Sequence, residues 1–232
     1  WDLINIQHAT TAPLQELINA FHMEDGLPYD ESPLYDSDNP YENRDPRFYT
    51  TVIYPGARFK NDDVTGTTYA HTGYALKKYS VYDADVGDPP ASVSDIKDGQ
   101  SHTNYMIIRY ADVLLMFAEA TNEVSGPTPE VYDAIRQVRG RVGMPDIGTG
   151  HSKDELREII RHERRIEFVG EGLYYNDIRR WKTIEEVNNG DVHRWDGQLR
   201  SSRRFDPGKD YWWPIQQSQL DLNPKLEQNE GY

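Results

Sequence analysis

The densest group of ionisable side chains lies at residues 161–181, where the sequence reads RHERRIEFVGEGLYYNDIRRW. Five arginines stand there beside four acidic residues. Such a set could bind phosphate or nucleic acid, or it could form ion pairs with itself. The acidic side chains alternate with the arginines, and charge-mixed helices usually pair internally. The pattern therefore favours an internal ion-pair network that fixes a corner between two helices.

Glu163 is the carboxylate in this stretch that most needs a partner. It follows Leu156 by one heptad, which places it on or beside the apolar face of a predicted helix. A carboxylate in apolar surroundings costs several kcal/mol unless a cation accompanies it. We expect Arg179 or Arg180, which follow the glycines that end this helix, to supply that cation.

Asp112 and Glu119 form a second acidic pair, on a helix predicted at residues 104–124. One interpretation is that both carboxylates bind arginines from the following helices. The other is a pair for acid–base chemistry, which needs an open cleft and a raised pKa on one member. A glycan-processing hydrolase would need two carboxylates about 5–10 Å apart. Arginines nearby would lower the pKa values instead, so the structural interpretation is favoured.

Signatures of known catalytic and metal sites are absent from the sequence. It has no G-x-S-x-G elbow, P-loop or G-x-G-x-x-G motif, and no cysteine. His162 and Glu163 lack the second histidine of a zincin helix. Asp83, Asp85 and Asp88 with Gly87 bear a weak likeness to a calcium loop, without the other ligands. We therefore predict no catalytic residue, no cofactor and no metal.

Aromatic side chains on a polar loop are candidates for sugar binding. Tyr29, Tyr35 and Tyr41 recur every six residues in an acidic loop at residues 24–47, and the short helix before that loop could bring Trp1 nearby. Flat rings cover the C–H faces of pyranoses, while amides and carboxylates bind the hydroxyls. The same tyrosines could instead fasten the loop to the body. We predict these four residues as the ligand-binding set.

The elements that position these residues follow from apolar periodicity. Helical spacing predicts a short helix at 13–22 and longer ones at 104–124, 129–142 and 153–169. Ser152 and Glu155 form a capping box for the last of these. The helix at 104–124 is apolar around most of its circumference, so it should be largely buried. The link at residues 125–127 between the helices at 104–124 and 129–142 is short, which predicts that these two helices form an antiparallel hairpin.

The remaining chain is irregular. A short strand is predicted at 48–53, and residues 61–101 and 185–208 are polar and turn-rich. The tail at 211–232 is predicted to lie extended over the helices, anchored by Trp212, Trp213 and Ile215.

Composition limits the possible partners. The 232 residues carry a net charge of -14, which argues against nucleic acid or anionic lipid. Mean hydropathy is -0.82, and no run approaches the roughly 18–20 apolar residues that span a bilayer.

Seven runs of residues, in order along the chain, resemble SusD/RagB-like proteins. They read LQELINAF (14–21), NRDPR (43–47), GYALKK (73–78), RYADVLLM (109–116), VRGRVGM (138–144), ERRIE with DIRRW (163–181) and WPIQQSQLDLNPKLEQNEGY (213–232). The resemblance implies a mainly α fold of tetratricopeptide-like helical hairpins arranged as an α superhelix, with long irregular loops and few short strands. Family members are usually about twice as long, so the resemblance identifies this chain as the C-terminal part.

The same resemblance implies a separate role for each part of the chain. Residues 1–103 would form a loop-rich ligand-side segment, 104–184 a helical core, and 185–232 a loop and extended tail. The expected function is non-catalytic capture of oligosaccharide nutrients for a SusC-like TonB-dependent transporter. The parent protein would sit on the outer membrane surface, lipid-anchored through an N-terminus outside this chain, and its N-terminal segment would complete the fold. Alternatives are a peptide-binding receptor of the same family, a glycan hydrolase and a purely structural subunit.

Overall fold

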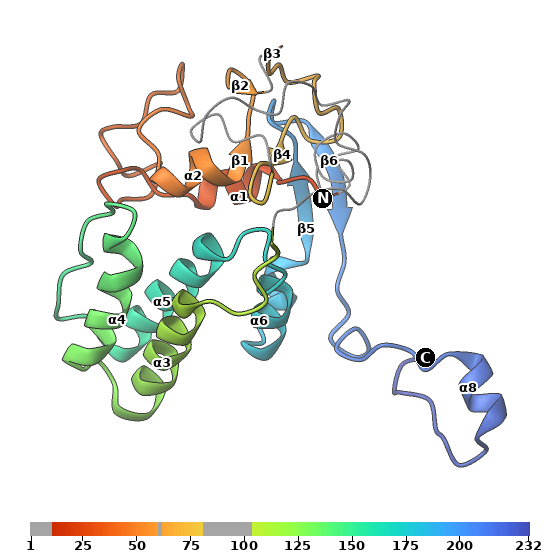
Figure 1. The fold of residues 1–232 in the computed structure, drawn as a ribbon. Coiled ribbons are helices and arrows are strands. Elements are labelled where there is room, and N and C mark those ends of the chain that lie inside the picture. Colours follow the sequence, from red (N-terminus) through yellow and green to blue (C-terminus); the bar gives the residue numbers. More distant parts are fainter. Residues whose placement is uncertain (1–10, 60–61, 81–103) are drawn as a thin grey trace.

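The computed structural model describes residues 11–59, 62–80 and 104–232, which are mostly helical with a few short strands (Figure 1). The helices are α1 (Gln15–Ala20), α2 (Pro46–Thr51), α3 (Tyr110–Ser125), α4 (Pro129–Gly140), α5 (Lys153–Glu167), α6 (Tyr174–Arg180), α7 (Ile184–Val187) and α8 (Gln217–Leu222). The strands are β1 (Val52–Ile53), β2 (Arg58–Phe59), β3 (Asp62–Asp63), β4 (Ala75–Leu76), β5 (Gly190–His193) and β6 (Leu199–Arg203). They form three antiparallel pairs, β1–β4, β2–β3 and β5–β6. Within the described ranges, every helix is too short or too polar to cross a membrane.

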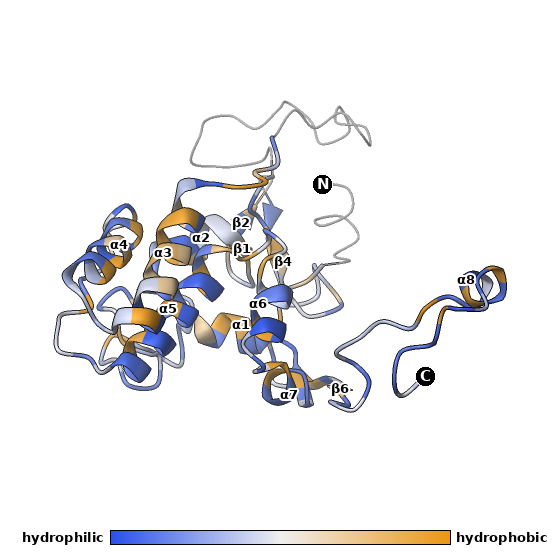
Figure 2. Ribbon diagram, turned by 90° about the horizontal axis from the view of Figure 1, so that it is seen from below, coloured by the Kyte–Doolittle hydropathy of each residue, from blue (hydrophilic) through white to orange (hydrophobic). Residues whose placement is uncertain are grey.

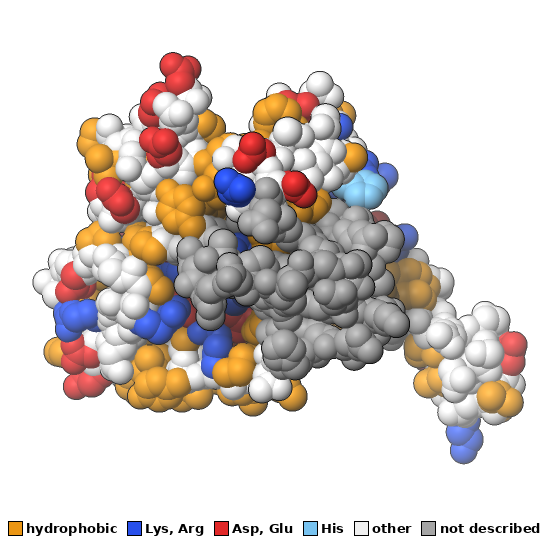
Figure 3. Space-filling view, turned by 45° about the horizontal axis from the view of Figure 1, so that its top comes forward, with side chains coloured by type: hydrophobic (Ala, Val, Ile, Leu, Met, Phe, Trp, Pro, Cys, Tyr) orange, Lys and Arg blue, Asp and Glu red, His pale blue; other side chains and the backbone are white. Residues whose placement is uncertain are grey.

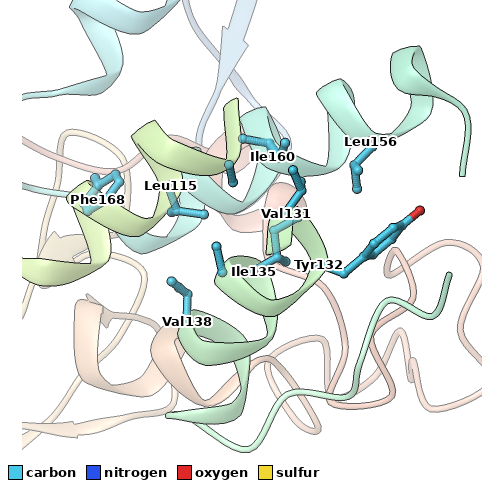
Figure 4. Close-up of a cluster of buried hydrophobic side chains, with 10 residues drawn as sticks. Leu115, Val131, Tyr132, Ile135, Val138, Leu156, Ile160 and Phe168 are labelled. Carbon is cyan, nitrogen blue, oxygen red and sulfur yellow. The ribbon is translucent and has the colours of Figure 1, made fainter. Parts of the chain in front are cut away.

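Three helices, α3, α4 and α5, form the main core. Leu115 of α3, Ile135 of α4 and Ile160 of α5 are fully buried against one another (Figure 4). The predicted capping box starts α5, since the Ser152 hydroxyl accepts from the Glu155 amide and the Glu155 carboxylate accepts from the Ser152 amide. The three-residue link between α3 and α4 gives the predicted helical hairpin.

The helix predicted at 104–124 is shorter and less buried than expected. It begins at Tyr110, and Ile107 and Ile108 lie before it with 84% and 69% of their surface exposed. Val113, Met116 and Phe117 are nearly half exposed. The prediction of a largely buried helix is therefore wrong for the described part of the chain, because only one face of α3 meets α4 and α5.

A second core lies around α1, α2 and the β1–β4 pair, which Figure 1 places above the α3–α5 bundle. The strand predicted at 48–53 is wrong, because Asp45 caps α2 by accepting from the Arg47 amide (2.9 Å) and Pro46 occupies its first turn. Only Val52–Ile53 remains extended. The helix predicted at 13–22 is also shorter, at Gln15–Ala20.

The β5–β6 hairpin docks onto the turn before β4 through one tryptophan. Trp195 donates from its backbone amide to the Thr72 carbonyl (3.0 Å), and its indole lies against Gly66 and Gly73. A Cβ atom would come within 2.0 Å of the indole at Gly66 and within 2.1 Å at Gly73. Glycine is therefore required at both positions for this close approach.

The tail does not follow the prediction. Beyond Tyr211 it leaves the body, and Figures 1 and 2 both show it standing apart. Trp212 and Trp213, which we expected to be anchors, are 67% and 71% exposed. The tail instead bonds to itself. The Gln228 side chain accepts from the Ile215 amide (2.8 Å) and donates to the Ile215 carbonyl (2.9 Å).

Candidate functional site

Glu163 is buried between two arginines that come from other elements. Its Oε1 accepts from Nη1 of Arg47 at 2.5 Å, and its Oε2 accepts from Nη1 of Arg139 at 3.0 Å. Arg47 lies in the first turn of α2 and Arg139 in the last turn of α4. The expectation that Arg179 or Arg180 pairs with Glu163 is therefore wrong. Those residues sit beyond the helix corner, where Arg180 contacts Glu119 and Asp177.

The network continues one and two turns further along the chain. Glu167 accepts from Arg47 (2.9 Å), Arg109 and Arg141 (2.8 Å). Glu171 accepts from Arg109 (2.8 Å) and from Lys78. All these carboxylates are buried, as is Arg47. These acidic side chains are thus paired through charge-assisted hydrogen bonds, as predicted, but their cations come from outside residues 161–181.

A second network braces the corner between α5 and α6. Arg164 donates to Asp112 of α3 (2.9 Å) and to Asp177 of α6 (2.9 Å). Glu119 of α3 accepts from the Arg180 guanidinium and from the Trp181 indole N–H. The prediction that Asp112 and Glu119 bind arginines of the following helices is confirmed.

These contacts lower the pKa of two of the carboxylates, Glu167 and Glu119. Although burial acts to raise it, the pKa of Glu167 is lowered from its usual value by Arg109 and Arg47. The pKa of Glu119 is likewise lowered, because hydrogen bonds from Arg180 and Trp181 outweigh burial. A general acid of a glycosidase needs a raised pKa. Neither carboxylate suits that role, so these two networks are braces.

The predicted ligand-binding tyrosines fall into two groups. The rings of Tyr29 and Tyr35 meet edge to face with centroids 5.2 Å apart, and both are partly exposed. The Arg44 guanidinium lies 5.4 Å from the Tyr29 centroid and 5.6 Å from the Tyr35 centroid. Acidic side chains mark this protruding loop between α1 and α2 (Figure 3). The Tyr29–Tyr35 pair therefore places two partly exposed rings on a loop whose acidic side chains can accept hydrogen bonds.

Tyr41 lies elsewhere, in the second core. Its ring packs against Tyr54 (4.8 Å between centroids), and its hydroxyl lies 3.1 Å from that of Tyr74. It therefore fastens the loop to the body. Trp1 lies outside the described residues, as do the aspartates of the weak calcium pattern. Among residues 11–59, 62–80 and 104–232, no cluster of three or more acidic or histidine side chains is arranged to hold a metal.

Two residues of the site were not predicted from the sequence. Arg44 is buried and donates to the carbonyls of Pro40 (2.9 Å) and Phe21 (2.9 Å) while its guanidinium backs the two tyrosines. Arg47 is the cation for Glu163. Both belong to the run NRDPR, where the Asp-Pro step already signals a helix start, but nothing in the spacing names their distant partners.

The comparisons with known proteins agree with this architecture. The model of the SusD family matches residues 7–232. The SusD-like protein P2 of Formosa agariphila is 32% identical over 190 residues, which are 78% of this chain and 34% of that protein. The chain thus spans about a third of the length of this curated relative.

Solved structures show the same relation. A SusD-like carbohydrate binding protein from Bacteroides fragilis is 32% identical with a TM-score of 0.77, over 93% of this chain and 48% of that one. Surface glycan-binding protein A from Bacteroides thetaiotaomicron, solved with laminarihexaose, is 26% identical with a TM-score of 0.57, over 82% of this chain and 39% of that one. The chain belongs to the SusD family.

Proposed function

We propose that the protein containing this chain captures an oligosaccharide at the cell surface and passes it to a SusC-like TonB-dependent transporter. The observation that carries this proposal is the Tyr29–Tyr35 pair, held over Arg44 on a protruding acidic loop. Two rings at an angle cover the apolar face and edge of one sugar residue. The relatives that bind carbohydrate support the same ligand class.

The proposed roles divide along the chain. Residues 1–103 supply the ligand side, because they carry the tyrosine loop. Residues 104–184 form the helical core that holds this loop in place through Arg47, Arg139 and their carboxylate partners. Residues 185–232 supply the hairpin and tail. The parent protein is anchored at the outer membrane surface by a lipid on an N-terminus outside this chain.

An N-terminal segment of the same protein is the proposed partner of two apolar surfaces. One is the outer face of α3 with Ile107 and Ile108, and the other is the tail with Trp212 and Trp213. Exposed apolar patches of this kind mark interaction sites. The solved relative from Bacteroides fragilis has about as much chain again as the part that matches here. Further helical hairpins in that segment, stacked beside α3 and α4, form the tetratricopeptide-like superhelix.

The test of the tyrosine pair is calorimetry on the full-length parent protein with neutral hexasaccharides, laminarihexaose among them. Replacing Tyr29 and Tyr35 together by Ala is expected to weaken the affinity at least about tenfold, since stacked aromatic groups carry about 1–3 kcal/mol each. Tyr232→Ala, an exposed tyrosine of the tail, is the matched control and should leave the affinity unchanged.

Two results would contradict the proposal. Unchanged affinity in the folded double variant would remove the site, and release of cleaved sugar at many turnovers per protein would point to a hydrolase.

A further inference from the structure

A mostly apolar cavity of about 430 Å³ lies where α1, β4 and the turn between α5 and α6 meet. It is separate from the Tyr29–Tyr35 pair. Aliphatic side chains of Leu17, Leu76 and Val169 line it, with the backbone of Gly170 and Gly172. The aromatic residues of its wall are Tyr105, Phe168, Tyr174 and Tyr175. Pockets for small molecules are typically of roughly 300–1,000 Å³ with such a lining. The cavity therefore has room for one sugar ring.

Arg165 is the cation of this cavity, and it differs from the other arginines of α5. Arg161 pairs with Glu158, and Arg164 pairs with Asp112 and Asp177. In the described part of the chain no carboxylate pairs with Arg165, and its one hydrogen bond runs from Nη2 to the Glu16 carbonyl (3.2 Å). Its Nε is buried and has no acceptor among the described residues, which is also true of the Nε of Arg161, so the missing carboxylate partner is what distinguishes Arg165.

The guanidinium of Arg165 also lies over one aromatic ring. Its carbon lies 5.4 Å from the centroid of the Tyr174 ring, which also lines the cavity. The Nε atom has no exposed surface, so a ligand in the cavity would meet the Nη atoms, of which only Nη2 has a hydrogen bond among the described residues. A carboxylate is the best acceptor for them, because the bond is charge-assisted and matches the fork of the guanidinium.

We propose that this cavity binds a hexuronate residue, with its carboxylate on Arg165 and its ring against the aromatic and aliphatic walls. The proposal rests on the proposed function only for the carbohydrate class of the ligand. The net charge of -14 does not prevent it. Exposed charges beyond about 8–10 Å are largely screened at physiological salt, whereas the carboxylate meets Arg165 directly.

The experiment is calorimetry on the full-length parent protein with methyl β-D-glucuronide and methyl β-D-glucoside, which differ only at C6, a carboxylate in the first and a hydroxymethyl group in the second. The glucuronide is expected to bind at least about tenfold more tightly, as for a charge-assisted hydrogen bond. Arg165→Gln should abolish this difference, and Arg165→Lys should keep part of it. Arg161→Gln, one turn earlier on the same helix, is the matched control and should keep all of it.

Equal affinities for the two glycosides, or a preference that survives Arg165→Gln, would overturn the proposal. Thermal unfolding of each variant shows that it is folded. The variant with Tyr29 and Tyr35 replaced by Ala should bind the glucuronide normally. Loss of hexasaccharide binding there concerns the proposed function alone, and loss of the glucuronide preference in Arg165→Gln concerns this cavity alone.

Discussion

Arg47 donates to Glu163 although the two residues are 116 positions apart. The pair joins the first turn of α2 to the middle of α5, and both side chains are almost completely buried. Arg47 also bonds to Asp45 and Glu167, and Glu163 also bonds to Arg139. The loop-bearing half of the chain and the helical half are therefore joined by a buried, charge-assisted hydrogen bond.

Removing the Glu163 charge should destabilise the protein strongly. Glu163→Gln leaves Arg47 and Arg139 buried with less negative charge between them, and breaking a buried ion pair from one side costs about 3–5 kcal/mol. Urea unfolding followed by tryptophan fluorescence measures this cost. Glu158→Gln removes an exposed partner of Arg161 and should change the free energy of unfolding by less than about 1 kcal/mol. Similar changes in the free energy of unfolding for Glu163→Gln and Glu158→Gln would contradict a stabilising role for the buried ion pairs of Glu163.

Two stacked histidines should make stability depend on pH. The rings of His22 and His162 lie 4.0 Å apart. Burial lowers the pKa of His162 to about 3, with the neighbouring charge of His22 adding to the effect, and burial followed by Arg139 lowers the pKa of His22. The unfolded chain binds these protons near the usual pKa of about 6.5, so stability is complete above that pH and is lost as pH falls towards 3.

The variant His162→Gln should flatten this loss as the pH falls below about 6.5. Each histidine contributes at most about 1.4 kcal/mol per pH unit. Urea midpoints measured at half-unit steps of pH give the slope. His71→Gln, at an exposed position, should leave the slope as it is. An unaltered slope in His162→Gln would show that the pair does not control the pH dependence.

A methyl group at Gly66 should displace Trp195. The added Cβ would lie 2.0 Å from the indole, so the hairpin has to shift, and overpacking of this kind costs about 1–3 kcal/mol. The Gly66→Ala variant should also show altered tryptophan fluorescence. Gly140→Ala is the matched control, since a Cβ there meets nothing within 4 Å and alanine favours the helix. Equal stability of the two variants would contradict the close packing.

Deleting residues 212–232 should affect this chain and the parent protein differently. In the described structure these residues bond mainly among themselves, so the melting temperature of the shortened chain should fall by no more than about 2 °C. In the parent protein the tail is proposed to pack on the N-terminal segment, and the same deletion should lower the melting temperature by at least about 4 °C. Equal shifts in the two backgrounds would contradict that packing.

At residues 161–181 the sequence correctly predicted that the charged side chains form ion pairs, but it did not predict all of the partners. Alternating charges at 161–181 indicated internal ion pairs, and Asp112 and Glu119 do bind Arg164 and Arg180. The predicted partner of Glu163, Arg179 or Arg180, was wrong. Arg47 and Arg139 reach Glu163 only through tertiary packing, which local spacing does not encode. The hairpin of α3 and α4 and the capping box of α5 were predicted correctly, since their signals lie within a few residues of each other.

The tyrosine loop shows the same limit. A regular spacing of six suggested one surface, yet Tyr41 turns into the core and meets Tyr74, while Tyr29 and Tyr35 meet each other. In a loop without regular secondary structure, sequence spacing does not fix the direction of a side chain. The prediction for the tail was wrong for a related reason, since the sequence of its apolar residues does not reveal which surface they cover.

The two hydrogen bonds between the Gln228 side chain and the Ile215 backbone have a consequence for assembly. A side-chain amide there imitates the two hydrogen bonds of a neighbouring strand, so the tail closes into a loop of its own. A segment that already holds its bound shape loses less conformational entropy when it meets a partner. In the proposed packing on the N-terminal segment, Trp212 and Trp213 are therefore presented in a preorganised conformation, which should raise the affinity between the two halves of the protein.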